Sequence, residues 1–371
     1  MAKPPKKPID PLDSKDSGLD SILDSIQGEL NKAFGEGTAS RLSDAATYSK
    51  IDNWVSSRSI VVDSVLRGGR PVGSSLVPFG RQVELSGKPG SGKTTLCAQI
   101  AAETVAQGGI VLITDTEERI DHDYWTSLGA DPTKMVHIQA TTLEEVFEKQ
   151  YRAIKFARET APNHLMLSIW DSLGGTSLDK IVDDAAEGSP MEQAEKAMGK
   201  KAKVISSGME LINTLVSSSN CCYLYTNHIY QKMGNTGYGE MTETPGGNKP
   251  KFFATVRLRL TPVGKIQAED PVSGEEMTIG HRVRVKALKN SMAGHLLERD
   301  AVILGGSGYS NDYTIFEVAG KLGAIKKSGA WSTWETPSGD EVKFQGWNGF
   351  LDKVIPHPEY QDLFDTIVNA M

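Results

Sequence analysis

The residues best suited to chemistry lie in one short glycine-rich segment. It matches the pattern G-x-x-x-x-G-K-[ST] at every fixed position and consists of Gly87, Lys88, Pro89, Gly90, Ser91, Gly92, Lys93 and Thr94. Backbone N–H groups of such a loop turn toward a phosphate, while its lysine reaches the β- and γ-phosphates and its hydroxyl ligates Mg²⁺. A strand-like run at residues 82–86 precedes the loop, and a helix-like run follows from Thr95. Because the pattern requires this strand–loop–helix context, we expect a nucleotide-phosphate site that includes Thr95.

Two carboxylates follow strand-like runs elsewhere in the chain. The apolar run at residues 165–170 ends in Asp171, where a carboxylate beside the phosphate loop would hold the water shell of Mg²⁺. The alternative for Asp171 is a helix N-cap. The run at residues 110–114 leads to Glu117, which could orient and deprotonate an attacking water. The other acidic residues around Glu117 leave open a plain solvated acidic loop.

A third strand-like run, residues 221–226, ends in Asn227 and His228, which we expect to face the same crevice. The polar, glycine-rich stretch at residues 231–248 is typical of a mobile loop. Lysines cluster on both sides of this region, at Lys196, Lys200, Lys201, Lys203, Lys249 and Lys251. Two basic loops at one sheet edge could form a track for a phosphate backbone, whereas a solvated face is the default for any single lysine cluster.

The composition narrows the class of protein. The chain has 371 residues, of which 39% are hydrophobic and 23% charged, as in ordinary soluble globular proteins. No apolar run approaches the roughly 20 residues of a membrane span, and the N-terminus does not resemble a secretory signal. The net charge of −7 argues against a generally basic nucleic-acid coat but leaves room for a local basic path.

Cys97, Cys221 and Cys222 lie in apolar patterns and are expected to be buried, reduced thiols.

The order of strand-like and helix-like runs predicts an α/β fold. Strands are expected at residues 82–86, 110–114, 135–139, 165–170 and 221–226, and helices at residues 94–107, 142–160 and 202–218. Near-continuous apolar strands separated by helices indicate a mostly parallel central sheet with helices on both faces. Ligands of such sheets bind at the carboxyl ends of the strands, where the residues described above fall. Alternating runs from about residue 253 to 305 predict antiparallel strands.

Four segments are expected along the chain. Residues 1–17 are rich in Pro, Lys, Asp and Ser and are predicted to be disordered. Residues 18–50 contain a helix whose apolar residues share one face, residues 51–305 form the main core, and residues 306–371 form a small C-terminal α+β domain. The apolar stripe of the first helix could cover its own domain or a neighbouring subunit, and the stripe alone does not choose between them.

The order of these motifs resembles the RecA family of homologous-recombination strand-exchange ATPases, from about residue 30 to about residue 334. The matching segments are Leu30-Asn-Lys-Ala-Phe34-Gly-Glu-Gly, the phosphate loop, Asp115-Thr-Glu117, Asp171-Ser172, Met198-Gly199, Asn227-His228, Gly246-Gly247-Asn248-Lys-Pro-Lys-Phe252, Val283-Arg-Val-Lys-Ala-Leu-Lys289-Asn290 and Gly329-Ala330-Trp331. The resemblance implies a RecA-like P-loop ATPase core that uses ATP and Mg²⁺. It also implies that the first helix is a polymerisation arm that packs on the next subunit of a filament.

The resemblance also implies roles for individual residues. Lys93, Thr94 and Asp171 would form the ATP–Mg²⁺ set, Glu117 would be the catalytic glutamate, and Asp121 and Tyr124 would contact the adenine. DNA loops would lie near residues 188–204 and 231–248, with Met198 as an apolar wedge between bases. The full set of candidate DNA contacts is Met198, Gly199, Lys200, Lys201, Lys203, Lys232, Met233, Gly246, Gly247 and Asn248. Lys251, Phe252 and Lys289 would reach the ATP of a neighbouring subunit.

The chain departs from the bacterial pattern at four places. The segment between Asp171 and Met198 is longer than in bacterial members. His228 stands where bacterial members usually have glutamine. Histidine at this position is a feature of phage-type recombinases. Ser291 stands where bacterial members often have a second lysine, which puts a two-lysine interface contact in doubt. The C-terminal region lacks the usual acidic tail and is short for the family's C-terminal domain.

These features predict a recombinase that forms a helical filament on single-stranded DNA, pairs it with homologous double-stranded DNA and exchanges strands. ATP hydrolysis would loosen the filament, and His228 would sense the γ-phosphate and reposition the loop after it. Single-strand-binding and mediator proteins would be candidate partners, in the cytoplasm of a bacterial cell, with a phage-encoded origin as one alternative. The competing functions are a hexameric helicase on the same core and a regulatory or loading paralogue that exchanges nothing.

Overall fold

The computed structural model describes residues 17–41, 51, 53–74, 76–178, 190–217, 219–231, 242–269 and 273–371. The chain divides into two compact units, residues 1–50 and residues 51–371. The tail expected to be disordered, residues 1–17, lies outside the described residues except for Ser17. The expected boundary between residues 305 and 306 stays a prediction.

The N-terminal unit contains the predicted helix, α1 (Ser17–Phe34), which ends where Gly35 takes a positive φ of 104°. The segment after α1 folds back on it, because Asn31 bonds both backbone groups of Ala39 and Arg41 pairs with Asp20 and Asp24 at 2.7 Å each. The apolar stripe of α1 is exposed and consists of Leu19, Ile22, Leu23, Ile26, Leu30 and Phe34. The helix is therefore confirmed, while its role as a polymerisation arm stays a prediction.

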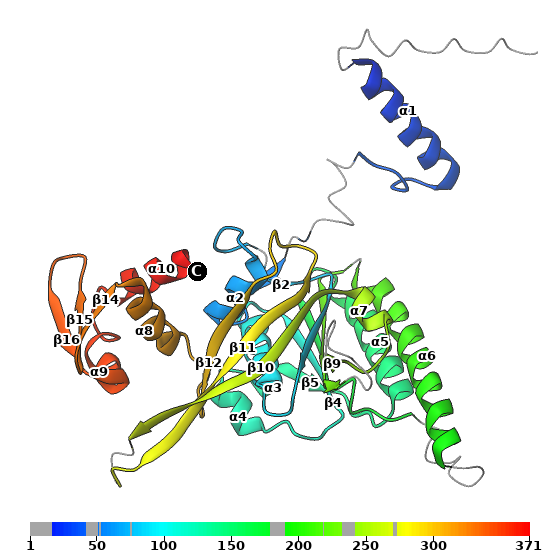
Figure 1. Ribbon diagram of the computed structural model, residues 1–371. Helices are drawn as coiled ribbons and strands as arrows, with labels where there is room; N and C mark the ends of the chain where they lie inside the picture. Colours follow the sequence, from blue (N-terminus) through cyan, green and yellow to red (C-terminus); the bar gives the residue numbers. More distant parts are fainter. Residues whose placement is uncertain are drawn as a thin grey trace, which may run out of the picture. The chain divides into compact units, whose positions relative to one another are not determined.

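The second unit is built on a nine-stranded sheet in the order β13-β12-β11-β10-β3-β7-β6-β4-β5 (Figure 1). From β10 to β5 the neighbouring strands run parallel, and β11, β12 and β13 continue the sheet antiparallel to their neighbours. The bounds are β3 (Gln82–Gly87), β4 (Ile110–Asp115), β5 (Met135–His137), β6 (Met166–Asp171), β7 (Cys221–Asn227), β10 (Ala254–Glu269), β11 (Glu276–Asn290), β12 (Glu298–Leu304) and β13 (Gly308–Tyr309). The predicted α/β fold with a mostly parallel sheet is confirmed.

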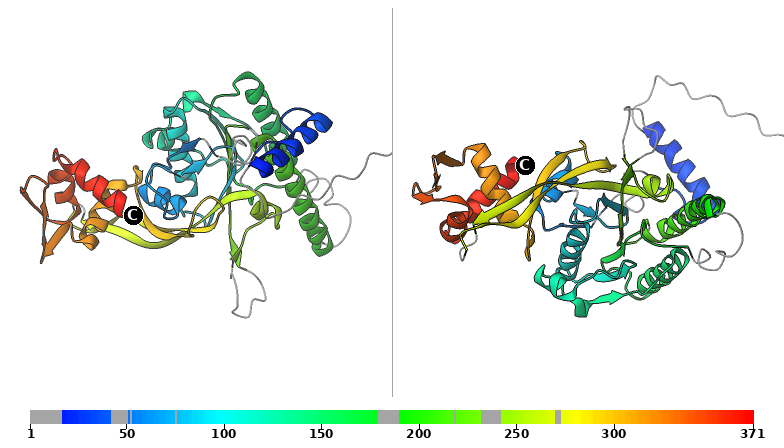
Figure 2. Two further views of the ribbon diagram at one scale, coloured as in Figure 1. Left: turned by 90° about the horizontal axis from the view of Figure 1, so that it is seen from above. Right: turned by 60° about the horizontal axis from the view of Figure 1, so that its bottom comes forward.

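Helices cover both faces of this sheet, and each face has its own hydrophobic core. On β6, Leu167 and Ile169 belong to the core that contains α2 (Ile60–Arg67) and α3 (Lys93–Ala106). Met166 and Trp170 alternate with them and belong to the core that contains α5 (Leu143–Thr160) and α6 (Pro190–Val216). Helices α5 and α6 lie side by side in all views (Figures 1 and 2). No helix of the described chain is long and apolar enough to cross a membrane.

Helix α6 starts at Pro190, whereas the predicted helix starts at residue 202, so α6 is longer than predicted. Proline at the first position of a helix loses no hydrogen bond, and the sequence after it is rich in Met, Glu, Gln, Ala and Lys, which are strong helix formers. Much of the segment expected as the first DNA loop, residues 188–204, is therefore helical from residue 190 onward.

Short elements connect the main ones. They are β1 (Trp54–Val55), β2 (Val77–Pro78), α4 (His122–Ser127), the 3₁₀ turn η1 (Pro132–Lys134), β8 (Tyr230–Gln231), β9 (Thr242–Glu243) and α7 (Lys249–Phe253). β1 pairs with β2 and β8 pairs with β9, both antiparallel. The short α4 follows β4 and α7 precedes β10, so both lie directly beside the strands that carry candidate site residues.

The C-terminal part has a separate small core. It contains the antiparallel sheet β14-β15-β16 and three helices. The bounds are α8 (Asn311–Leu322), β14 (Ile325–Ser328), β15 (Trp331–Glu335), β16 (Glu341–Phe344), α9 (Gly346–Lys353) and α10 (Tyr360–Ala370). Aromatic side chains such as Trp334, Phe344 and Phe350 fill this core. Arg282 of β11 donates two hydrogen bonds to Glu317 of α8 and so links the C-terminal part to the large sheet.

The three cysteines are free thiols buried in the main unit. Cys97 lies on α3, and Cys221 and Cys222 begin β7. Burial raises the pKa of all three thiols, that of Cys221 to about 12. The prediction of buried, reduced thiols is consistent with this placement.

Close packing of α6 on α5 gives a testable consequence. A Cβ added at Gly208 would lie 2.4 Å from ring atoms of Phe147, which is buried and packs edge-on against Trp170 at 5.2 Å. Since this ring has no room to move, we expect Gly208→Ala to destabilise the fold by about 1–3 kcal/mol. The shift of the urea unfolding midpoint measures the effect. Gly199→Ala on the same helix, where nothing lies within 4 Å, is the control and should be neutral or stabilising by about 1 kcal/mol. Equal midpoints for the two variants would contradict the packing argument.

Candidate nucleotide-binding site

The phosphate loop joins β3 to α3 and is shaped by its glycines. A Cβ at Gly87 would lie 2.4 Å from the hydroxyl of Ser91, so only glycine fits there. Gly92 caps α3 with a φ of 84°, a conformation that favours glycine. The ammonium group of Lys93 folds back over the loop and donates to the carbonyl oxygens of Gly87 and Lys88, both at 3.1 Å. Burial lowers the pKa of Lys93, and the nearby Asp171 and Glu117 oppose this effect.

Asp171, at the end of β6, joins three elements. The hydroxyl of Thr94, in the first turn of α3, donates to Oδ2 of Asp171 at 2.6 Å. The hydroxyl of Thr226, on β7, donates to Oδ1 of the same carboxylate. The Asp171 side chain is buried, and this burial raises its pKa although both hydroxyl donors act in the opposite direction. The site therefore contains a hydroxyl and a carboxylate side by side at the start of the phosphate-loop helix.

Glu117 accepts hydrogen bonds or ion pairs at both carboxylate oxygens. Ser172 and Nε2 of His228 contact Oε1, the latter at 2.6 Å, and Nη1 of Arg119 pairs with Oε2 at 3.0 Å. Burial alone would raise the pKa of Glu117. The hydrogen bonds from Ser172 and His228 and the charge of nearby basic groups outweigh burial, so its pKa is lowered. Glu117 is thus held as a carboxylate in this position.

The loop that carries Glu117 is organised by Asp115. Its carboxylate accepts from the backbone N–H groups of Glu117 at 3.0 Å, Arg119 at 2.6 Å and Ile120 at 2.8 Å. These bonds hold Glu118 at a φ of 52°, which a non-glycine residue adopts only when its surroundings impose it. The acidic run is therefore a folded turn, and the alternative of a plain solvated loop does not describe it.

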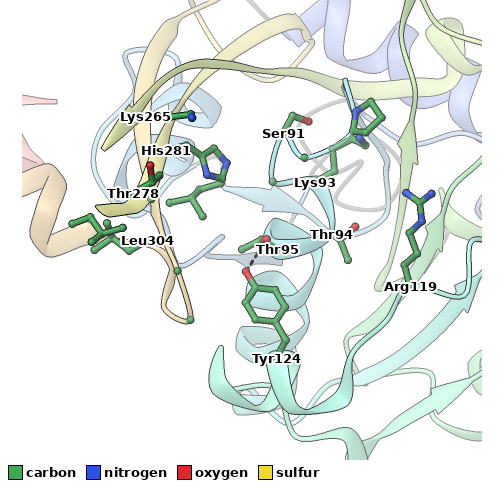
Figure 3. A pocket seen from close by; sticks show the side chains of 18 of the residues that line it. Ser91, Lys93, Thr94, Thr95, Arg119, Tyr124, Lys265, Thr278, His281 and Leu304 are labelled. Carbon is green, nitrogen blue, oxygen red and sulfur yellow. Dashed lines mark hydrogen bonds between the residues drawn. The ribbon is translucent and has the colours of Figure 1, made fainter. Parts of the chain in front are cut away.

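A cavity of about 600 Å³ opens between the phosphate loop and the antiparallel end of the sheet. On one side Tyr124 lies 3.0 Å from the hydroxyl of Thr95. On the other side are Lys265, His281 and Leu304 (Figure 3). Arg119 lies beyond Thr94 (Figure 3) and pairs with Glu117, which contacts His228. The volume of the cavity is typical of a pocket for a small organic ligand.

Most residues predicted to bind ATP line this cavity. They are Pro89, Gly90, Ser91, Gly92, Lys93, Thr94, Thr95, Glu117, Tyr124, Asp171 and His228. Gly87, Lys88 and Asp121 do not line it. Asp121 has another contact. Its carboxylate caps α4 and accepts from the N–H groups of Asp123 and Tyr124 at 2.9 and 3.0 Å.

The expectation that Asn227 and His228 face the same crevice is wrong for Asn227. Its amide donates to Glu84 at 3.0 Å and to the carbonyl of Pro245 at 3.2 Å, away from the cavity. Successive side chains of a strand point to opposite faces, so only His228 reaches the cavity. Glu84 also pairs with Arg257, which leaves a buried polar network between β7, β3 and β10.

The residues expected at a subunit interface lie together around α7. Phe252 is 72% exposed. Lys289 of β11 donates to the carbonyl oxygens of Lys251 at 3.1 Å and Phe252 at 2.8 Å. Within one chain Lys289 therefore supports the end of α7 and the base of Phe252, and its contact with a neighbouring ATP stays a prediction.

The residues expected to bind DNA are only partly described. Gly199, Lys200 and Lys203 of α6 are exposed. Gly246, Gly247 and Asn248 lead directly into α7, with Asn248 at its N-cap. Lys201 is only partly exposed and its amine faces inward. The side chain of Met198, together with Lys232 and Met233, lies outside the described residues.

The sequence reasoning missed several residues of the site. Ser172 and Thr226 hold Glu117 and Asp171, and a hydroxyl next to a predicted site carboxylate could have pointed to Ser172. Arg119 belonged to the run that contained Glu117 but was not assigned a role. Lys265 and His281 come from the antiparallel strands, far along the chain, and no local pattern marks them.

A family model described as the RecA N-terminal domain matches residues 21–310, which contain all the site residues described above. A curated relative named Protein RecA, from Sulfurimonas denitrificans, is 29% identical over 343 residues, covering 92% of each chain. Protein RecA of Helicobacter hepaticus is 32% identical over 311 residues, covering 82% of this chain and 81% of the relative. Protein RecA of Brucella anthropi is 30% identical over 321 residues, covering 85% of this chain and 80% of the relative. The chain belongs to the RecA family of ATP-dependent DNA strand-exchange recombinases.

Proposed function

We propose that this protein hydrolyses ATP between the subunits of a helical filament on single-stranded DNA and exchanges that strand with a homologous duplex. The observation that carries the proposal is the contact between His228 and Glu117 at 2.6 Å, beside the phosphate loop. His228 directly follows β7, which leads into residues 231–248, the predicted second DNA loop. A residue that touches the candidate catalytic carboxylate and continues into a DNA loop is suited to couple hydrolysis to DNA.

The residues around the phosphate loop fit ATP with Mg²⁺. Mg²⁺ is a hard cation that takes oxygen ligands, usually one or two protein groups together with substrate phosphates. Thr94 and Asp171, 2.6 Å apart, supply such oxygens and would hold the ion, Asp171 through water. The bound ion would supply charge neutralisation on the β- and γ-phosphate oxygens. Lys93 would turn from the loop carbonyls to these phosphates, and Tyr124, with Asp121 behind it, would border the adenine.

Glu117 would orient and deprotonate the attacking water. Both of its oxygens are engaged in the described chain, so at least one contact has to be exchanged before a water can be held. Its lowered pKa keeps it deprotonated, which a general base requires. His228 would move toward the γ-phosphate and so release one oxygen of Glu117, an order–disorder type of switch for the loop that follows.

DNA and neighbouring subunits would complete the site. The candidate DNA contacts named from the sequence, among them the exposed Lys200 and Lys203, would bind phosphates largely without sequence preference. The exposed stripe of α1 would pack on the next subunit, and Phe252 and Lys289 would face its ATP. Single-strand-binding and mediator proteins would act on such filaments in a bacterial cell, whether the gene is bacterial or from a phage. The family assignment favours neither a hexameric helicase nor a non-exchanging paralogue.

Lys93→Ala tests the proposed activity directly. Removing the ammonium group that reaches the phosphates should lower ATP hydrolysis and strand exchange by at least about 100-fold. Strand exchange is measured with single-stranded DNA and a homologous duplex, and electron microscopy with ATP should show helical filaments of the wild type. Lys155→Ala, an exposed change on α5, is the control. Closed rings, or a wild type without strand exchange, would overturn the proposal.

His228→Ala tests the coupling of hydrolysis to DNA. The change removes the contact with Glu117 but no group of the phosphate loop. We therefore expect ATP binding to stay intact while the stimulation of hydrolysis by single-stranded DNA is abolished. Hydrolysis rates with and without DNA, together with ATP titrations, measure this difference. Unchanged stimulation would refute the role of His228.

Ser172→Ala tests Glu117 as the general base. The serine hydroxyl lowers the pKa of Glu117, so its removal raises that pKa. Because only the deprotonated carboxylate can accept a proton, activity should then be lost at higher pH as the solution is acidified. We expect the acidic limb of the kcat profile to move to higher pH. Thr160→Ala at the end of α5 is the control, and an unmoved limb in Ser172→Ala would argue against Glu117 as the base.

A further inference from the structure

Lys201 is buried more deeply than Lys200 and Lys203, the other two lysines of its cluster with described side chains on α6. Its ammonium group donates to the carbonyl oxygen of Thr176 at 2.7 Å and to that of Gly174 at 3.3 Å. Burial lowers the pKa of Lys201. Lys200 and Lys203 on the same helix are exposed. Successive residues of an α-helix are rotated by about 100° around its axis. Lys200 and Lys203 therefore share one face of α6, and Lys201 points away from it.

The carbonyls that Lys201 contacts belong to the segment directly after Asp171. The Thr176 hydroxyl donates back to the carbonyl of Ser172 at 2.7 Å and lies 2.9 Å from the hydroxyl of Thr116. The N–H of Gly175 donates to the Ser172 hydroxyl at 3.2 Å, and that hydroxyl donates to Glu117. A continuous set of hydrogen bonds therefore runs from Lys201 to the carboxylate of Glu117.

The segment is closely packed on both sides. A Cβ at Gly175 would lie 3.1 Å from Oε1 of Glu117, and one at Gly174 would lie 2.9 Å from Oδ1 of Asn227. The backbone thus passes directly between the Glu117 side and the Asn227 side of the site. Because Gly175 and Thr176 are hydrogen-bonded to Ser172, a shift of the carbonyls held by Lys201 would displace Ser172 relative to Glu117.

We propose that Lys201 is a positioning residue for ATP hydrolysis, which aims Ser172 at Glu117 by holding the backbone at residues 174–176. The inference rests on the proposed function and assigns Lys201 a role other than the phosphate contact expected from its cluster. Because Lys201 lies on α6, two residues after Gly199, it also connects the helix that carries candidate DNA contacts to the catalytic carboxylate. A movement of this helix on DNA reaches Glu117 through Lys201.

The experiment compares Lys201→Met with Lys203→Met, which removes an exposed lysine of the same helix. The salt dependence of single-stranded DNA binding comes first. A lysine that binds a phosphate reduces the slope of log affinity against log salt by about 1 when removed. We expect this reduction for Lys203→Met and an unchanged slope for Lys201→Met.

Hydrolysis at saturating DNA is the second measurement. Lys201→Met should lower kcat about tenfold with little change of the KM for ATP. The change disturbs the geometry of the hydrogen bond from Ser172 to the charged Glu117 but leaves the phosphate loop intact. Lys201→Arg, which keeps donors at this position, should recover most of kcat. Lys155→Met is the control for a general loss of lysine charge.

A double-mutant cycle shows whether Lys201 acts through Ser172. In the Ser172→Ala background, Lys201→Met should have little further effect on kcat, since the hydroxyl that it aims is gone. Additive effects would overturn the inference, as would a reduced salt slope with an unchanged kcat in Lys201→Met. If Lys201→Met does not fold, Lys201→Gln in the same cycle gives the comparison. A wild type without DNA-stimulated hydrolysis would instead refute the proposed function, so the two failures are distinguishable.

Discussion

The Asp171 carboxylate is the group on which the geometry of the site depends. It receives hydrogen bonds from Thr94 of α3 and Thr226 of β7, so the phosphate-loop helix and two strands are fixed at one point. Burial of this carboxylate raises its pKa, and the two hydroxyl donors stabilise its charged form. Parallel strands end at the same edge of a sheet, and this edge therefore brings together groups that lie far apart in the sequence.

Glu117 is held at the same edge of the sheet by contacts to its side chain and to its backbone. Its partners come from three directions: Ser172 after β6, His228 after β7, and Arg119 from its own loop. None of these contacts uses the backbone of Glu117, which is held separately by Asp115. The backbone and the side chain of Glu117 are therefore held by different partners. Several hydrogen bonds that fix one side chain are a common feature of functional sites.

The fold and the phosphate-binding half of the site could be predicted from the sequence, because both depend on local patterns. Buried parallel strands give near-continuous apolar runs, and the phosphate loop is contiguous. The remaining features depend on the direction in which individual side chains point. Lysine spacing showed a basic cluster on α6 but not that Lys201 turns inward, and the strand end at Asn227 and His228 presents only one of the two to the cavity. Lys265 and His281 lie on strands brought near by the sheet order, which no short pattern contains.

The burial of the three thiols has a practical consequence for spectroscopy. Cys97, Cys221 and Cys222 are buried and their pKa values are raised, so they react slowly with reagents that attack thiolates. A single cysteine introduced at an exposed position, such as Lys155 on α5, would be the preferred site for a fluorophore or spin label. A chain with this one substitution can thus be labelled at a chosen point without first removing its own cysteines.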